Sequence, residues 1–238
     1  MNSVRKAQGF TLVEIAIVLV IIGLLLGGIL KGQEMITQAK IKNVIADFSG
    51  ISAAYHGYVD RYKKIPGDDP CAGGTVTLGN CGTTTGRWTG ATAGNGNGVV
   101  AGAYNSPTNT DESRLWWDHL RRAGFVSGVG DQQPFNALSG MIGVQTGDAA
   151  ATPAATLKDA AGNGFVGIII CSANLPDKIA IAADTQMDDG IRTTGQLRGQ
   201  LNAAPTPAIV ADAVTGAGQV AGNYIQNGTN VYTLCRSL

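Results

Sequence analysis

The 238-residue chain has no net charge, because 17 lysine and arginine residues balance 17 aspartate and glutamate residues. Without a strong overall field, it is poorly suited to recruiting nucleic acid or acidic substrates. It has only two histidines and neither an HExxH nor a CxxC motif, which leaves no zinc site of the usual kinds. We find no grouping of a serine or cysteine with a base, as nucleophilic catalysis requires. The sequence therefore predicts a protein that is not an enzyme.

Proline is also absent until Pro66, so no proline interrupts a helix in the amino-terminal segment. Residues 1–9 are short and polar, with Arg5 and Lys6 as their only charges, and Glu14 is the single charge in the apolar residues 10–30. As a helix rising ~1.5 Å per residue, this apolar run just spans a ~30 Å hydrocarbon core. Positive charge before the span predicts that the amino terminus stays inside and the remainder lies outside.

An ordinary secretory signal or signal anchor is the alternative interpretation of this segment. The apolar run is longer than the roughly 7–15 residues of a signal peptide, and no small-residue cleavage site follows it. A carboxylate inside a membrane span is costly and is retained mainly where it has a function. Glu14 is therefore a candidate functional residue.

Residues 9–14 read GFTLVE and follow a basic leader. This pattern resembles the processing signature of type IV pilins and type II secretion pseudopilins. The resemblance implies cleavage after Gly9 by a membrane prepilin peptidase, N-methylation of Phe10, and packing of the apolar helices in a filament core. It also implies that Glu14, at the fifth mature position, contacts the Phe10 amine of a neighbouring subunit during assembly.

The implied partners are copies of the same chain, other pilins, the prepilin peptidase and the assembly machinery of the bacterial inner membrane. Before assembly the protein would lie in that membrane. After assembly it would belong to an extracellular pilus or a periplasmic pseudopilus.

A second helical pattern continues directly from the apolar run. Apolar residues recur every three or four positions from Ile41 to Tyr62, and Pro66 ends the pattern, which predicts a helix over residues 10–64. We expect a leader at 1–9, a transmembrane or filament-core helix at 10–32, and a globular head at 33–238 that includes the second half of the helix. The predicted fold class is α+β, with this long helix packed on an antiparallel sheet.

The remaining head contains short elements between loops rich in glycine, which numbers 34 residues in the chain. Two further helices are predicted, at 111–122 with Gly124 as its cap and at 176–189. The clearest strands are 141–145 and 164–171, and residues 224–235 predict a hairpin around Asn227-Gly228. Residues 147–163 and 202–222 are expected to be surface loops.

Four cysteines allow three disulfide pairings. Cys71 and Cys81 share one glycine-rich loop, whereas Cys171 and Cys235 would tie a central strand to the carboxyl end, as pilins commonly do. We therefore expect Cys71–Cys81 and Cys171–Cys235.

Asp184, Asp188 and Asp189 form the main candidate metal site, and Asn95 and Asn97 form a weaker one. Hard oxygen ligands favour calcium, and some pseudopilins hold calcium in a carboxylate loop. However, Asp184 and Asp188 are four residues apart on a predicted helix, where both can simply be solvated. We expect no obligatory cofactor, with calcium as the open alternative.

Three functions compete. The first is a structural subunit, major or minor, of a type IV pilus, and the second is a pseudopilin of a type II secretion system. The third, a membrane-tethered periplasmic protein with a catalytic or binding role, is disfavoured by Glu14 and by the lack of a catalytic grouping.

Overall fold

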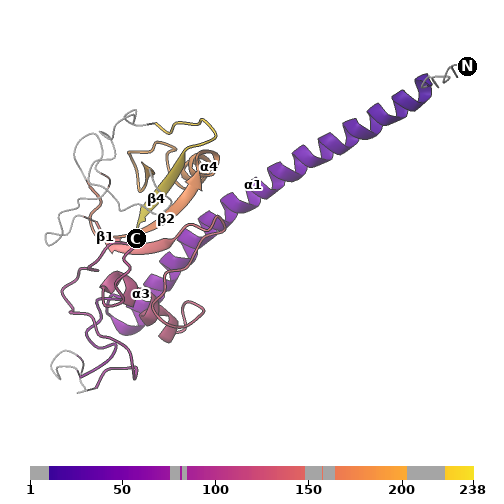
Figure 1. Ribbon diagram of the computed structural model, residues 1–238. Helices are drawn as coiled ribbons and strands as arrows, with labels where there is room; N and C mark the ends of the chain where they lie inside the picture. The colour runs from indigo at the N-terminus through magenta and orange to yellow at the C-terminus, as the bar shows by residue number, and fades with distance from the viewer. Residues whose placement is uncertain (1–10, 76–80, 82–84, 148–156, 158–163, 203–222) are drawn as a thin grey trace, which may run out of the picture. The chain divides into compact units, whose positions relative to one another are not determined.

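The computed structural model describes residues 11–75, 81, 85–147, 157, 164–202 and 223–238. The chain divides into two parts, residues 1–39 and residues 40–238. Helix α1 (Leu12–Tyr62) begins in the first part and ends in the second. The other elements of the described residues are α3 (Glu112–Arg122), β1 (Ile142–Thr146), β2 (Ile168–Pro176), α4 (Asp177–Met187), β3 (Leu197–Leu201) and β4 (Val231–Ser237) (Figure 1).

The four strands form one antiparallel sheet in the order β1-β2-β4-β3. Strand β4, the last in the chain, therefore lies between β2 and β3, and Figure 1 shows it beside β2. Together with the long amino-terminal helix, this sheet confirms the predicted α+β class.

The second part of α1 packs through the face that the sequence periodicity indicates. Its buried side chains are those of Ile41, Val44, Phe48, Ile51, Ala54 and Tyr58. They share one hydrophobic cluster with Val144 and Ile170 of the sheet and with Trp116 and Trp117 of α3. The apolar stripe of the helix is thus covered by the sheet and by α3.

Strand β2 is buried on both faces. Ile168 and Ile170 belong to the cluster under α1, whereas Ile169 and Cys171 belong to a second cluster that also contains Phe165. Successive residues of a strand point to opposite faces, so the run of three isoleucines serves both cores. The predicted strand at 164–171 is in the right place, but it begins four residues later and continues to Pro176.

Helix α3 matches its predicted bounds, and every residue from Glu112 to Leu120 is buried. Gly124 follows the helix with φ +81°, the left-handed conformation that commonly ends a helix. The buried side chains of Glu112, Arg114 and His119 in α3 are paired with surrounding loops. His119, for example, accepts the Gly67 N–H at Nδ1 (2.9 Å) and contacts the Thr92 carbonyl through Nε2 (2.8 Å).

The predicted hairpin at 224–235 is wrong. Residues 224–226 form no strand, and β4 pairs instead with β2 and with β3, a strand that the sequence did not predict. The physical reason is that the backbone N–H groups of Asn227 and Gly228 donate to the buried Asp177 carboxylate, at 2.8 and 2.6 Å. This turn is thus attached to the start of α4.

Helix α4 agrees with its prediction within two residues at its carboxyl end. The predicted loops at 147–163 and 202–222 lie almost entirely outside the described residues.

Candidate functional site

Thr11 and Glu14 form a reciprocal hydrogen-bonded pair where α1 begins. The backbone N–H and the hydroxyl of Thr11 both donate to Oε2 of Glu14, at 2.8 and 2.7 Å, and the Glu14 N–H donates to Thr11 Oγ1 at 3.3 Å. The Thr11 carbonyl accepts the N–H of Ile15, which makes Thr11 the N-cap residue. This is a capping box, in which each side chain satisfies a backbone donor that the first helical turn leaves open.

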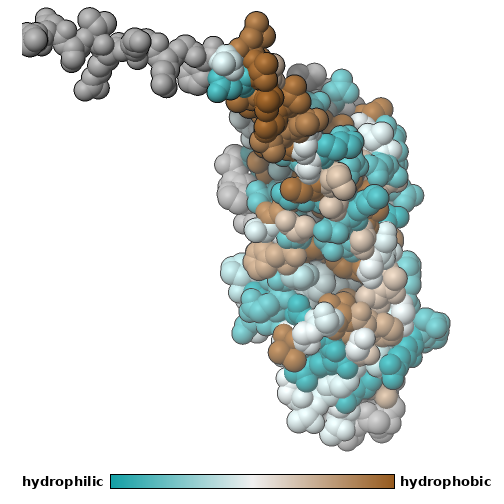
Figure 2. Space-filling model, turned by 90° about the vertical axis from the view of Figure 1, so that its right-hand side faces the viewer, coloured by the Kyte–Doolittle hydropathy of each residue, from teal (hydrophilic) through white to brown (hydrophobic). Residues whose placement is uncertain are grey.

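The first part of α1 exposes apolar side chains all around the helix. The large ones are Leu12, Val13, Ile15, Ile17, Val18, Leu19, Val20, Ile21, Ile22, Leu24, Leu25, Leu26, Ile29, Leu30, Met35 and Ile36. Figure 2 shows this apolar surface gathered over the start of α1. By length and composition, α1 is able to cross a membrane.

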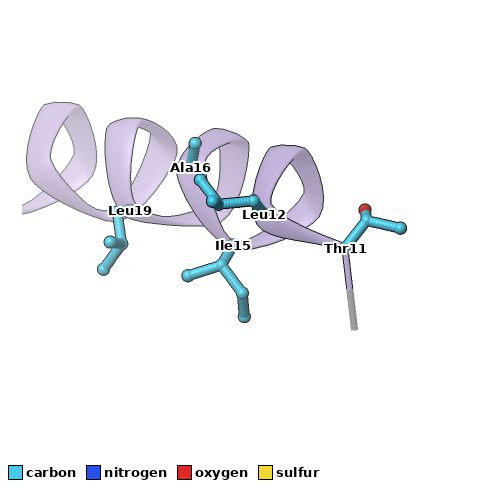
Figure 3. A pocket seen from close by; sticks show the side chains of 5 residues that line it. All are labelled: Thr11, Leu12, Ile15, Ala16 and Leu19. Atoms are coloured by element: carbon cyan, nitrogen blue, oxygen red, sulfur yellow. The ribbon is translucent and has the colours of Figure 1, made fainter. Parts of the chain in front are cut away.

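Figure 3 shows the first turns of this surface, with Thr11 at the helix start and Ile15 and Leu19 directed to the same side. Leu12 and Ala16 line the same shallow groove. Spacings of three and four residues place these side chains together on one helix face.

The two predicted processing residues, Gly9 and Phe10, lie outside the described residues. Glu14 is exposed, and among the described residues no lysine or arginine forms an ion pair with it. Its local partners are the neutral donors of Thr11, so its negative charge is not compensated within this helical turn.

Both expected disulfides are present. Cys71 is bonded to Cys81, and Cys171 is bonded to Cys235. The second bond joins directly paired positions of β2 and β4, and both of its cysteines are fully buried. It therefore ties the two central strands together.

The structure brings the three candidate calcium ligands together. Each of Asp184, Asp188 and Asp189 offers a carboxylate oxygen, and these oxygens lie within 4.8 Å of one another. Oxygen ligands of calcium lie about 2.3–2.6 Å from the ion, so oxygens at this spacing can share one ion. Asp184 is buried, Asp188 half-buried and Asp189 exposed, which opens the cluster to solvent on one side.

The same carboxylates also have protein partners. Asp184 accepts the hydroxyl of Tyr224 at 2.5 Å, and Asp188 accepts the backbone N–H of Leu197 at 2.7 Å. Burial raises the pKa of Asp184 to about 6, and the charges of Asp188 and Asp189 add to the rise. The three carboxylates thus lie close together, and their hydrogen bonds hold the end of α4 against β3 and Tyr224.

The weaker calcium candidates, Asn95 and Asn97, lie in the loop that precedes α3. Their side-chain oxygens accept the backbone N–H groups of Asn97 and Val99, both at 2.9 Å. These contacts are those of Asx turns.

Sequence reasoning missed two residues of these sites. Thr11 had a recognisable signal, since threonine followed three residues later by glutamate before an apolar run is the pattern of a capping box. Tyr224 had none, because it is 40 positions from Asp184 and only the fold brings the two side chains together.

The model of the prokaryotic N-terminal methylation motif matches residues 4–30. No curated protein and no solved structure gave a significant match to this chain. The matched residues include the polar stretch with Arg5 and Lys6, the Thr11–Glu14 pair, and most of the exposed apolar surface. The motif is a structural signature and not an enzymatic one. The amino-terminal segment of this chain thus carries the signature of type IV pilins and pseudopilins.

Proposed function

We propose that this protein is a structural subunit, major or minor, of a bacterial type IV pilus. The observation that carries the proposal is the combination within residues 4–30 of the methylation motif with an apolar helical surface that contains one charge, Glu14. A helix with exposed apolar side chains on all sides needs lipid or other helices around it. The membrane supplies the first environment and a filament core supplies the second.

In this proposal the chain is inserted with its amino terminus inside and its head outside, and the prepilin peptidase cleaves after Gly9. Helix α1 starts at Leu12, so the Gly9–Phe10 bond is on the amino-terminal side of the helix. Cleavage removes Arg5 and Lys6 and leaves 15 basic and 17 acidic residues from the original 17 and 17. It also creates a cationic α-amino group on Phe10, which methylation keeps basic.

Glu14 would then align the incoming subunit. Thr11 binds the Glu14 carboxylate through neutral donors only, so the carboxylate retains a full charge that attracts a cation. In a staggered filament the Phe10 amine of a neighbouring subunit can come level with Glu14. An ion pair in an apolar filament core is strong because little solvent screens it.

A pseudopilin of a type II secretion system is the second candidate function. The acidic cluster at Asp184, Asp188 and Asp189 favours it, because some pseudopilins hold calcium in a carboxylate loop. Both candidates require the same processing and the same helix packing, and they differ in where the filament forms and what it moves.

Deletion of the gene, with complementation by the wild-type chain, tests the proposal. A pilus subunit predicts that surface filaments disappear or change in number, and that subunits isolated from them begin at methylated Phe10. If surface filaments are unchanged and secreted proteins accumulate in the periplasm, the pseudopilin function replaces the pilus function. Subunits that retain Met1 in assembled filaments would contradict both.

A further inference from the structure

The chain contains four Asn-Gly dipeptides, which are the peptide sequences most prone to spontaneous deamidation. In this reaction the backbone nitrogen of the glycine loses its proton to a base in solution and attacks Cγ of the asparagine. A new C–N bond closes a succinimide ring while the Cγ–NH₂ bond breaks and ammonia leaves. Water then opens the ring to aspartate or isoaspartate. Glycine favours the attack because it has no side chain to hinder it.

The first two pairs, Asn95-Gly96 and Asn97-Gly98, surround the buried carboxylate of Asp68. The N–H groups of Gly96 and Gly98 donate to its two oxygens, at 2.6 and 2.7 Å. The N–H of Asn97 also donates to it, at 3.0 Å. Asp68 is 4 % exposed, so solvent competes little for these donors. Successive N–H groups that converge in this way form a nest for an anion.

A third pair, Asn227-Gly228, repeats the arrangement in a different part of the head. The N–H of Gly228 donates to Oδ2 of Asp177 at 2.6 Å, and the N–H of Asn227 donates to the same oxygen at 2.8 Å. Asp177 is 2 % exposed and begins α4. Gly164 of the fourth pair is described, but Asn163 is not.

All three described pairs also hold the asparagine side chain in the same way. The side-chain oxygens of Asn95, Asn97 and Asn227 each accept the backbone N–H two residues further on, at 2.9, 2.9 and 3.0 Å. Both reacting groups of each pair are therefore fixed by hydrogen bonds, the glycine nitrogen by an aspartate and the asparagine side chain by an Asx turn.

We propose that Asp68 and Asp177 protect these three Asn-Gly pairs against deamidation. The attacking form of the glycine nitrogen is an anion, and a carboxylate within hydrogen-bonding distance opposes its formation by like-charge repulsion. Deprotonation would also remove a charge-assisted hydrogen bond in a site with little water to replace it. The hydrogen bond keeps the nitrogen directed at the carboxylate and away from Cγ. Glycine thus allows a tight turn at each pair, and the aspartate slows the deamidation that glycine would otherwise favour.

The full-length chain in detergent, incubated in mildly alkaline buffer, tests this proposal by peptide mass spectrometry of each pair. In the native wild type, Asn95, Asn97 and Asn227 should deamidate at least about tenfold more slowly than in the urea-denatured chain. Asp68→Asn keeps the size and one oxygen acceptor but removes the charge. It should accelerate deamidation at Asn95 and Asn97 by about tenfold and leave Asn227 unchanged.

Asp177→Asn is the matched reciprocal variant, and it should accelerate only Asn227. The site that each variant leaves intact reports on folding, since global unfolding would accelerate all three pairs to the denatured rate. Even if a variant unfolds, the native wild type must deamidate more slowly than the denatured chain. Equal native and denatured wild-type rates, or folded variants with wild-type rates, would overturn the proposal.

Discussion

The backbone N–H and the hydroxyl of Thr11 converge on one carboxylate oxygen of Glu14, at 2.8 and 2.7 Å. Thr11 thus positions the carboxylate of Glu14, the residue that the sequence indicates as the assembly residue. Glu14 has two separable properties, an oxygen that caps the helix and a negative charge. A substitution that removes only one of them can assign the role of each.

Glu14→Gln keeps the capping oxygen, because glutamine also serves in a capping box, but it removes the charge. If the charge aligns subunits, Glu14→Gln and Glu14→Val should both insert and be processed, yet reduce filament number by about tenfold or more. Glu14→Asp should be intermediate. Thr11→Val is the matched control that removes the hydroxyl and keeps the charge, and its filament yield should exceed that of Glu14→Gln. Electron microscopy counts the filaments, and normal numbers for Glu14→Gln would contradict the charge mechanism.

Calcium should stabilise the head if the acidic cluster binds it. A ligand at about 100 times its dissociation constant adds about 2.7 kcal/mol of stability, which raises the melting temperature by several degrees. The full-length chain in detergent is melted with calcium and with a chelator. Asp189→Asn changes the exposed member of the cluster, so it should fold normally and lose the calcium shift. If the wild-type melting temperature is the same with calcium and with chelator, the three aspartates do not bind calcium and have a structural role.

His119 should make the head less stable in acid. Burial lowers the pKa of His119 from 6.5 to about 4, and Nδ1 cannot gain a proton without losing the Gly67 N–H. The unfolded chain therefore binds more protons than the folded chain between these values. The stabilisation from the neutral ring is complete above pH 6.5 and is lost as the pH falls to about 4, by ~3 kcal/mol in total.

His119→Gln does not titrate in this range, which makes it the matched variant. Urea unfolding at a series of pH values should give a flatter pH dependence for the variant than for the wild type, although the variant is less stable at neutral pH. Parallel pH dependences would show that His119 does not titrate on unfolding.

The two disulfides should differ in their response to reductant. Cys171 and Cys235 are fully buried between β2 and β4, whereas Cys81 is partly exposed. A mild reductant applied to the native protein should open Cys71–Cys81 first, because thiolate attack requires access to sulfur. Replacing both Cys171 and Cys235 by alanine should cost about 2–4 kcal/mol of unfolding free energy. Alkylation and peptide mapping identify the order, and prior reduction of Cys171–Cys235 would contradict the expectation.

The sequence predicted the elements whose signals are local. The apolar periodicity of α1 and the glycine after α3 are properties of short segments, and both helices lie where they were expected. Glu14 was found for the same reason, since one charge in an apolar run is visible in the sequence alone.

The errors concern pairings that only the fold decides. Strand β3, with the sequence LRGQL, has no clear alternation of apolar and polar residues and contains a glycine. It becomes a strand because it pairs with the edge of β4. Asn227-Gly228 gave a strong hairpin signal, but its N–H groups bind Asp177 from 50 positions away. Asp184 and Tyr224 were not associated for the same reason.

The sheet order has a consequence for the route by which the head acquires its structure. β4 follows β2 and β3 in the sequence and pairs with both, so neither neighbour has that partner until β4 joins the sheet. Such distant pairings carry a large loop-closure cost and form slowly. The sheet thus remains incomplete until β4 takes its place between β2 and β3. Loss of β4 would separate β2 from β3 and leave Cys171 without its disulfide partner.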